Sequence, residues 1–205
     1  MALDGLDIGY GGMYVNSEEN PRRPQGALAG EEGRPIFGRG EIKMKLSLEQ
    51  VFEIAQYSFV RLDGAWFMAL AGKLGREVAW EIDVEAWKQF SYVFAKNIRR
   101  HFIPNPVWPE SFLDVLEILS RILKIEGREV FVGSNIITVR VTDCENQKAI
   151  AKAGIADCGI VTVQTYQGLI KGLFGKEVDV FVEHTKNLNR GDDCCEVVIS
   201  MQSGV

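Results

Sequence analysis

Long apolar runs, an excess of basic residues and a secretory leader are all missing from this sequence. The longest apolar candidate, residues 59–74, is interrupted by Arg61, Asp63 and Lys73, so it falls short of the ~18 uninterrupted apolar residues that a membrane span needs. The first residues carry neither a basic region nor an apolar leader region. These absences predict a soluble, cytoplasmic protein without a membrane span.

The charge balance argues against a nucleic-acid partner. The chain has 23 lysines and arginines against 28 aspartates and glutamates, for a formal net charge of −5 at pH 7. Binding to phosphates needs a basic face, and the basic runs in this chain are short. The hydrophobic fraction of 46% is that of a globular protein, and the length suits one domain with an appendage or two small domains.

The sequence also lacks cysteine before residue 144 and has no CxxC pair, P-loop, HExxH, GxSxG or GxGxxG motif. Its four cysteines follow in the last part of the chain: Cys144, Cys158, Cys194 and Cys195. Thiols stay reduced in the cytosol, and the thiolate is both the metal ligand and the nucleophile. The clustering therefore predicts one local thiolate site rather than a disulfide framework.

Glycine and proline are concentrated at the start of the chain. The first 40 residues hold nine glycines and three prolines without apolar periodicity, which predicts an extended or flexible N-terminal arm over residues 1–45. The arm is either a loose tail or a segment that orders on a partner. Its candidate anchors are Tyr10, Met13, Tyr14, Ile36 and Phe37. A single α+β ligand-binding-type domain is predicted over residues 46–205.

Helical periodicity starts after the arm. Ser47 and Gln50 form the ends of a capping box, and Asp83 is predicted to cap a later helix. The predicted helices cover residues 48–75 (as one helix or two), 84–98, 110–124, 147–153 and 161–173. Their order places a helical half before the first predicted strand.

Strand periodicity appears only after residue 127. The predicted strands cover residues 128–133, 135–142, 177–185 and 195–201. They form two hairpins separated by helices. The predicted fold class is α+β, with N-terminal helices packed on an antiparallel sheet of about four strands.

Three of the cysteines are predicted metal ligands. Adjacent residues of a strand point to opposite faces, so Cys195 joins Cys144 and Cys158 if its face meets the helices. Zinc suits such thiolate ligands, with three protein ligands in catalytic sites and four in structural ones. The fourth ligand is open among Glu145, Asp157, His184, Glu196 and water. Buried reduced cysteines or a redox-active or catalytic thiol are the alternatives.

Other residues are candidates for catalysis or ligand binding. Cys195 is a candidate nucleophile, with His184 or Glu196 as its base. Aromatic residues are common in the helical half and could line an apolar pocket or simply form the core. The candidate ligand-binding residues there are Asp63, Trp66 and Trp87.

The order of helices, hairpin, helices and hairpin, with the final run Gly191-Asp-Asp-Cys-Cys-Glu-Val-Val-Ile199, resembles two related families. One is the 4-vinyl-reductase-like small-molecule-binding domain, and the other is the L-2-amino-thiazoline-4-carboxylic acid hydrolase family. The resemblance covers residues 46–201. The resemblance to the first family implies an organic ligand held between helices and sheet, beside a zinc ion bound by cysteines and an acid. The cysteine ligands here would be Cys144, Cys158 and Cys195.

These observations leave three functional hypotheses. The first is a domain that binds a small apolar or amphipathic molecule next to a cysteine-ligated zinc ion. The second is a hydrolase that opens a C–N or C–S bond with a metal-activated water or with a cysteine. The third is a subunit whose N-terminal arm wraps a protein partner or a second copy of the chain.

Overall fold

Five helices and four strands make up residues 45–201, the part of the chain that the computed structural model describes. The helices are α1 (Leu48–Leu74), α2 (Arg76–His101), α3 (Glu110–Ile122), α4 (Glu145–Lys152) and α5 (Gly159–Phe174). The strands are β1 (Arg128–Val132), β2 (Ile136–Val141), β3 (Val180–Lys186) and β4 (Cys195–Met201). The predicted α+β class is confirmed. The predicted arm and its anchors lie outside the described residues, apart from Lys45.

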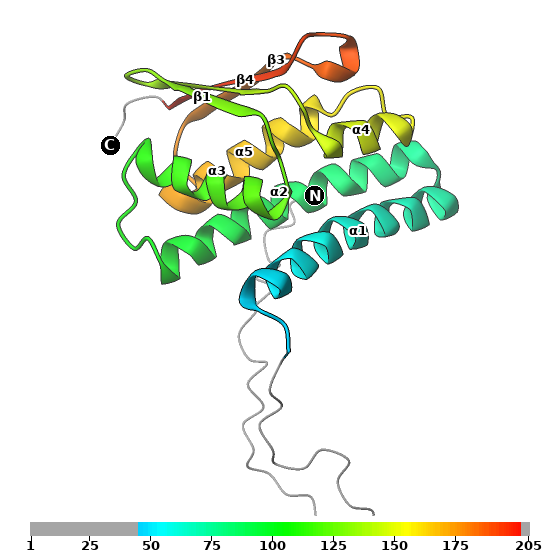
Figure 1. The fold of residues 1–205 in the computed structure, drawn as a ribbon. Helices are drawn as coiled ribbons and strands as arrows, with labels where there is room; N and C mark the ends of the chain where they lie inside the picture. Colours follow the sequence, from blue (N-terminus) through cyan, green and yellow to red (C-terminus); the bar gives the residue numbers. More distant parts are fainter. Residues whose placement is uncertain (1–44, 202–205) are drawn as a thin grey trace, which may run out of the picture. The chain divides into compact units, whose positions relative to one another are not determined.

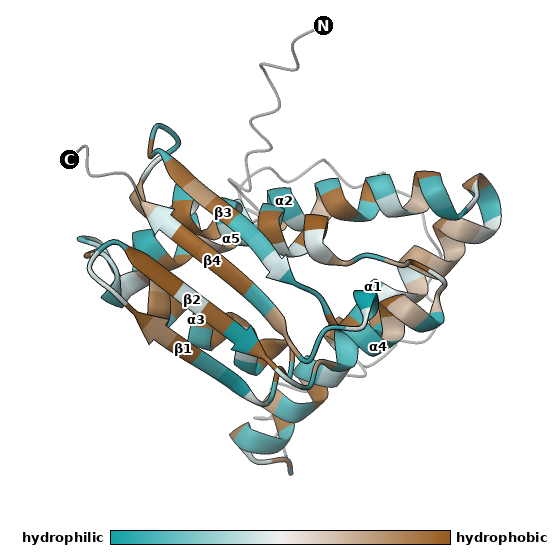
Figure 2. Ribbon diagram, turned by 90° about the horizontal axis from the view of Figure 1, so that it is seen from above, coloured by the Kyte–Doolittle hydropathy of each residue, from teal (hydrophilic) through white to brown (hydrophobic). Residues whose placement is uncertain are grey.

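The strands form one antiparallel sheet in the order β1-β2-β4-β3 (Figure 2). Both predicted hairpins are present, and β2 and β4 join them in the middle. Val139 lies opposite Val130 on one side and Val197 on the other, while Ile199 lies opposite Val182. Because side chains alternate along a strand, these valines and isoleucines share the face that the helices cover (Figure 1).

Helix α5 lies under the sheet and against α2 (Figure 1). Two glycines allow this close approach. A Cβ atom at Gly168 would lie 2.9 Å from the Ser91 Cβ, and one at Gly172 would lie 2.8 Å from the Ala95 Cβ. Real Cβ atoms do not come so close, so the α2–α5 contact depends on these positions having no side chain.

The prediction that Asp83 caps a helix is wrong. Helix α2 starts at Arg76, directly after Gly75, whose φ of 86° both ends α1 and lets the next helix begin. The chain therefore turns on one glycine and needs no polar loop with a side-chain cap. Asp83 lies inside α2 as a half-buried carboxylate near Asp63 of α1.

Helix α1 begins as predicted and packs by one face only. Both hydrogen bonds of the capping box are formed, 2.9 Å from the Ser47 N–H to Gln50 Oε1 and 3.2 Å from the Gln50 N–H to Ser47 Oγ. Gln56, its one buried residue, donates a hydrogen bond to the Arg121 carbonyl oxygen. Phe59 packs on Trp87 with ring centroids 6.2 Å apart. The remaining surface of α1 is exposed.

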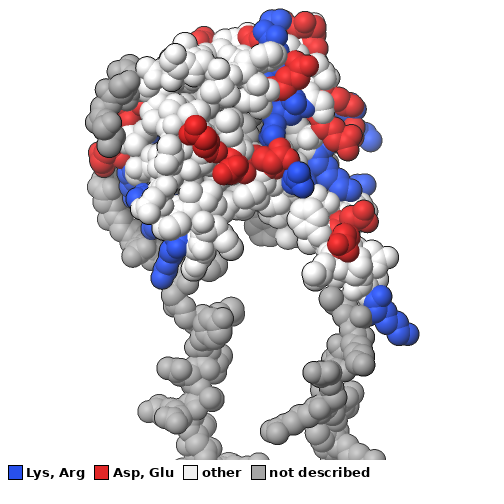
Figure 3. Space-filling view, turned by 60° about the vertical axis from the view of Figure 1, so that its left-hand side comes forward, with Lys and Arg blue, Asp and Glu red and all other residues white. Residues whose placement is uncertain are grey.

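Charges of both signs are mixed on the face shown in Figure 3, where lysine and arginine lie among aspartate and glutamate rather than forming one basic surface. None of the helices within residues 45–201 has the length and apolar character needed to cross a membrane.

Candidate thiol site

The chain brings cysteines together from three separate segments. Cys195 begins β4 opposite Val141, near the end of β2, and Cys144 follows that end as the N-cap of α4. Cys158 is the N-cap of α5. Val197 and Ile199 are buried against the helices, so Cys195 faces inward as the alternation predicts. The three sulfur-bearing residues therefore gather at one end of the sheet, above the start of α5.

Cys195 is the centre of this group. Its sulfur accepts hydrogen bonds from the Cys158 thiol and, at 3.5 Å, from the Leu188 N–H, and it also interacts with the His184 imidazole. The hydrogen bond from Cys158 is the main reason that the pKa of Cys195 is lowered to about 5; burial opposes this, and His184 and the Leu188 N–H add to it. A lowered pKa favours the thiolate, which is the nucleophilic form of cysteine.

Cys158 is the neutral partner of that thiolate. The hydrogen bond that the Cys158 thiol donates to the Cys195 sulfur raises the pKa of Cys158, and burial raises it further. The Cys158 sulfur also lies 3.8 Å from Oδ1 of Asn187, a side chain that is only 1% exposed. The contact between the two thiols therefore lowers the pKa of Cys195 and raises that of Cys158.

Asp157 and Asn187 hold this pair in place. Asp157 Oδ1 accepts hydrogen bonds of 2.7 Å from the Gly159 N–H and 2.6 Å from the Asn187 amide. Burial alone would raise the pKa of Asp157, but the Gly159 hydrogen bond and its ion pair with Arg190 leave the pKa lowered. The Asp157 carboxylate is therefore already bound by Gly159, Asn187 and Arg190.

His184 lies inside the site rather than at an exposed strand end. A Cβ atom at Gly159 would lie 2.5 Å from His184 Nδ1, so a side chain at the start of α5 would displace the imidazole. The His184 Nε2 atom is buried without a hydrogen-bond partner among the described residues. An unpartnered polar atom in such a place is costly unless something binds it.

Cys144 is a neighbour of the pair rather than a member of it. Its sulfur accepts a hydrogen bond of 3.4 Å from the Gln147 N–H. Burial raises the pKa of Cys144, and the charge of Cys195 raises it further. Within residues 45–201, no three His, Cys, Asp or Glu side chains are arranged so that they could hold a metal ion as they stand. The zinc site stays a prediction.

Two of the acids proposed from the sequence lie elsewhere. Glu196 follows Cys195 in the strand and therefore points to the opposite face, where it forms an ion pair of 2.6 Å with Arg140 and accepts a hydrogen bond of 2.9 Å from Thr185. Glu145 pairs with Lys148 at 2.7 Å. Neither carboxylate is brought to the cysteines.

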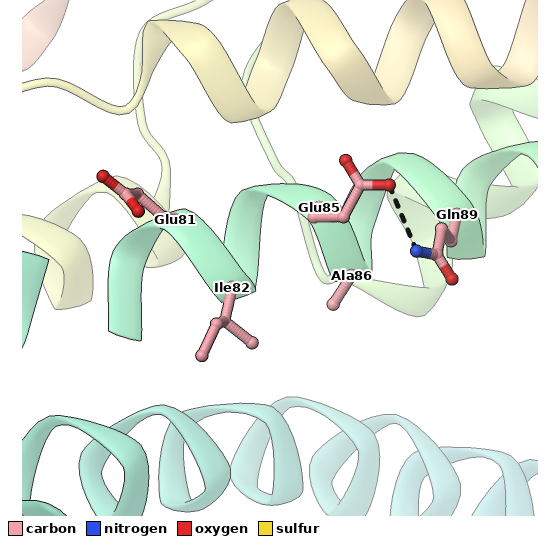
Figure 4. A pocket seen from close by; sticks show the side chains of 5 residues that line it. All are labelled: Glu81, Ile82, Glu85, Ala86 and Gln89. Atoms are coloured by element: carbon pink, nitrogen blue, oxygen red, sulfur yellow. Dashed lines mark hydrogen bonds between the residues drawn. The ribbon is translucent and has the colours of Figure 1, made fainter. Parts of the chain in front are cut away.

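The candidate ligand-binding residues lie in the helical half. Asp63 accepts a hydrogen bond from Trp87, and burial raises its pKa. Trp66 is 66% exposed. An open pocket of about 380 Å³ lies along α2 and is lined by Glu81, Ile82, Glu85, Ala86 and Gln89. Figure 4 shows Ile82 and Ala86 pointing towards α1. All five lining residues belong to α2, and none of the three candidate ligand-binding residues lines the pocket.

Asn187 and the Leu188 N–H are not among the site residues that the sequence predicts. Both belong to the loop between β3 and β4. The available signal was an asparagine directly after a strand, at the start of a short 3-10 helix (Leu188–Arg190) that it caps. Only the fold shows that this cap sits over Cys158.

Residues 43–192 match the sequence model of DUF6125, a family of unknown function. The chain belongs to this family. The segment matched to DUF6125 contains Cys144, Cys158 and His184 and ends before Cys195. No curated protein matches the sequence. The resemblance to the 4-vinyl-reductase-like and hydrolase families stays a prediction.

Solved structures resemble this DUF6125 member only distantly. The phenol-responsive sensory domain of the transcription activator PoxR, with phenol, is 11% identical over 67% of this chain and 72% of its own, with a TM-score of 0.46. A trafficking protein particle complex subunit 3 from Naegleria fowleri, covalently bound to palmitic acid, is 9% identical over 71% and 98%, with a TM-score of 0.45. The SO2144 H-NOX domain from Shewanella oneidensis is 13% identical over 76% of both chains, with a TM-score of 0.30.

Proposed function

We propose that this domain binds a small molecule at the site formed by Cys195, Cys158 and His184 and reacts with it through the Cys195 sulfur. The observation that carries the proposal is the convergence of three hydrogen-bonding groups on one sulfur, from α5, β3 and the β3–β4 loop. A cysteine that only fills space needs no such partners. The depressed pKa of Cys195 agrees with this reading.

The neighbouring thiol suggests thiol–disulfide exchange as the reaction. The Cys195 thiolate attacks one sulfur of a low-molecular-weight disulfide; a new S–S bond forms, the old one breaks, and a thiolate leaves with the electron pair. Cys158 then passes its proton to a leaving thiolate and attacks the Cys195 sulfur. The protein ends with a Cys158–Cys195 disulfide, and the small disulfide is reduced to two thiols.

The structure supplies a reason for this order of events. While Cys195 is charged, Cys158 is held protonated by its hydrogen bond to that charge. Once Cys195 is in a mixed disulfide, the charge is gone and the hydrogen bond with it. The pKa of Cys158 then falls, and the second thiol becomes able to attack.

Alkylation by iodoacetamide tests whether Cys195 is the reactive thiol. In the full-length protein, Cys195 should be modified first, with a rate that rises around pH 5, because the thiolate already exists there. Cys195→Ser should remove the fast phase, whereas Cys194→Ser, the adjacent residue on the opposite face, should leave it unchanged. His184→Gln should slow the reaction and shift its pH midpoint upward. Equal, slow modification of all four cysteines would overturn the proposal.

Oxidised glutathione tests the role of Cys158. The wild-type protein should form a Cys158–Cys195 disulfide, detected by peptide mass spectrometry, with little mixed disulfide remaining. Cys158→Ser should instead accumulate the mixed disulfide on Cys195, because nothing resolves it. A wild-type protein that stops at the mixed disulfide would rule out the exchange step while leaving the reactive thiol intact.

Zinc binding is the second candidate, and the unpartnered His184 Nε2 favours it. Three cysteines and one histidine form a common zinc ligand set, here Cys144, Cys158, Cys195 and His184. Such an ion would hold together the four segments that carry these residues. Elemental analysis of protein purified without a metal-affinity tag decides between the candidates. One zinc per chain that is lost in Cys144→Ser would replace the free-thiol proposal.

A further inference from the structure

Helix α1 carries a largely exposed apolar stripe along one flank. Its members recur at alternating spacings of four and three residues: Leu48, Phe52, Ala55, Phe59, Leu62, Trp66 and Ala69. We call these seven residues the α1 stripe. This is the heptad spacing by which two α-helices pack along a shared seam, and in the described part of the chain every member except Phe59 is exposed.

The stripe is large and open to solvent. Leu48 is 79% exposed, Leu62 69% and Trp66 66%. Single exposed apolar residues need no explanation, but a continuous apolar patch on a soluble domain marks an interaction surface. Phe59, in the middle, anchors the stripe to the domain through its contacts with Trp87 and Phe90.

We infer that the α1 stripe is the contact surface for a second copy of this chain, with the two α1 helices packed against each other. A heptad stripe is complementary to a helix that carries the same stripe, and a two-fold axis brings the same patch of both copies together. The stripe contains no charged residue, so two copies do not repel each other along it.

The exposed area agrees with this occupant. Leu48, Phe52, Leu62 and Trp66 together expose on the order of 500 Å² per chain, so two copies would cover about 1,000 Å², the size that a specific interface needs. The stripe runs for about 32 Å along the helix axis. The segment before α1 is rich in glycine and proline and has no heptad pattern, so its sequence is not complementary to a helical seam.

The opposite flank of α1 provides a matched control. Ile54 is 53% exposed and Met68 60%, so both are as accessible as the stripe. Their row is interrupted by Arg61, which stacks over Tyr57 with its guanidinium carbon 5.1 Å from the ring centre. A charged residue in the row makes it a poor helix seam.

Native mass spectrometry and light scattering of the full-length protein at micromolar concentration test the inference. The wild type should have twice the mass of one chain. The double variant Leu62→Glu/Trp66→Glu should be monomeric, with a dissociation constant at least ~100-fold weaker because two central apolar contacts become buried charges. Ile54→Glu/Met68→Glu should stay dimeric, and so should Leu62→Met, which keeps the apolar contact. Far-UV circular dichroism checks that each variant remains folded.

A monomeric wild type would overturn the inference, and so would dissociation by the Ile54→Glu/Met68→Glu pair with the stripe variants still dimeric. If the wild type is monomeric and Leu62→Glu/Trp66→Glu lowers its melting temperature, the chain's own N-terminal segment covers the stripe instead of a second copy.

Discussion

Helices α1 and α5 are both rich in apolar residues, but the fold uses them differently. In α5, Leu169, Ile170 and Leu173 are all 0% exposed between the sheet and α2. In α1, which at 27 residues is the longest helix described, the large apolar side chains mostly face solvent. Apolar content alone therefore does not decide which helix forms the core.

The two helices also use glycine differently. Gly172 of α5 touches the backbone of α2, whereas a Cβ atom at Gly64 of α1 would meet no atom within 4 Å. Close packing fixes α5 at every turn, while α1 keeps most of its surface free. Substitutions in α5 should therefore change the free energy of unfolding more than matched substitutions on the exposed flank of α1.

The largest predicted difference concerns leucine truncation. Leu169→Ala should lower the free energy of unfolding by about 2–5 kcal/mol, because it leaves a cavity in a packed core. Leu62→Ala should change it by less than about 0.5 kcal/mol in the monomer, because Leu62 is already 69% exposed. Chemical denaturation of both variants at low protein concentration measures the difference. Equal losses would mean that α1 belongs to the core.

Substitution by alanine should change stability in opposite directions at Gly172 and Gly64. Gly172→Ala should destabilise the fold by about 1–3 kcal/mol, because its Cβ would lie 2.8 Å from the Ala95 Cβ and 3.0 Å from the Lys96 N. Gly64→Ala should stabilise it by up to ~1 kcal/mol, since alanine is the better helix former and nothing obstructs it. Thermal unfolding should show melting temperatures that move in opposite directions, and a shift in the same direction would contradict the comparison.

The smallest predicted effect lies where α1 meets α2. Burial, followed by the charge of Asp63, raises the pKa of Asp83 to about 6. The folded state therefore binds this proton more tightly than the unfolded chain, so stability is highest at low pH and falls as the pH rises through about 6. Asp83→Asn should add roughly 1 kcal/mol at pH 8, after allowance for solvent screening of a half-exposed group, and nothing near pH 4.

The exposed carboxylate of Asp193 serves as a control, because its effect on stability should depend on pH in the opposite direction. The hydrogen bond from Lys186 lowers the pKa of Asp193, so its stabilising effect is present at neutral pH and is lost as the pH falls. Asp193→Asn should therefore reduce stability slightly at pH 8. Denaturation curves of both variants at pH 4 and pH 8 separate the two effects. If Asp83→Asn raised stability equally at pH 4 and pH 8, the raised pKa of Asp83 would not be the cause.

Local patterns allowed most of the fold to be predicted from the sequence. The capping box at Ser47 and the strand periodicity after residue 127 act over a few residues, so their effects are visible without the fold. The start of α2 was misjudged because Gly75 alone makes the turn and an aspartate inside a helix looks like a cap. That Cys195 faces inward was also predictable, since it shares a face with Val197 and Ile199.

The sequence by itself determined the α+β class, the strands and the inward face of Cys195, because these depend on periodicity and neighbouring residues. Only the tertiary structure decided that the Cys158 thiol donates a hydrogen bond to Cys195, that Asn187 lies against Cys158, and that an apolar flank of α1 stays exposed within residues 45–201. Those features arise from contacts between segments far apart in the chain, whose distances and orientations are set by the packing of the whole domain rather than by any local pattern.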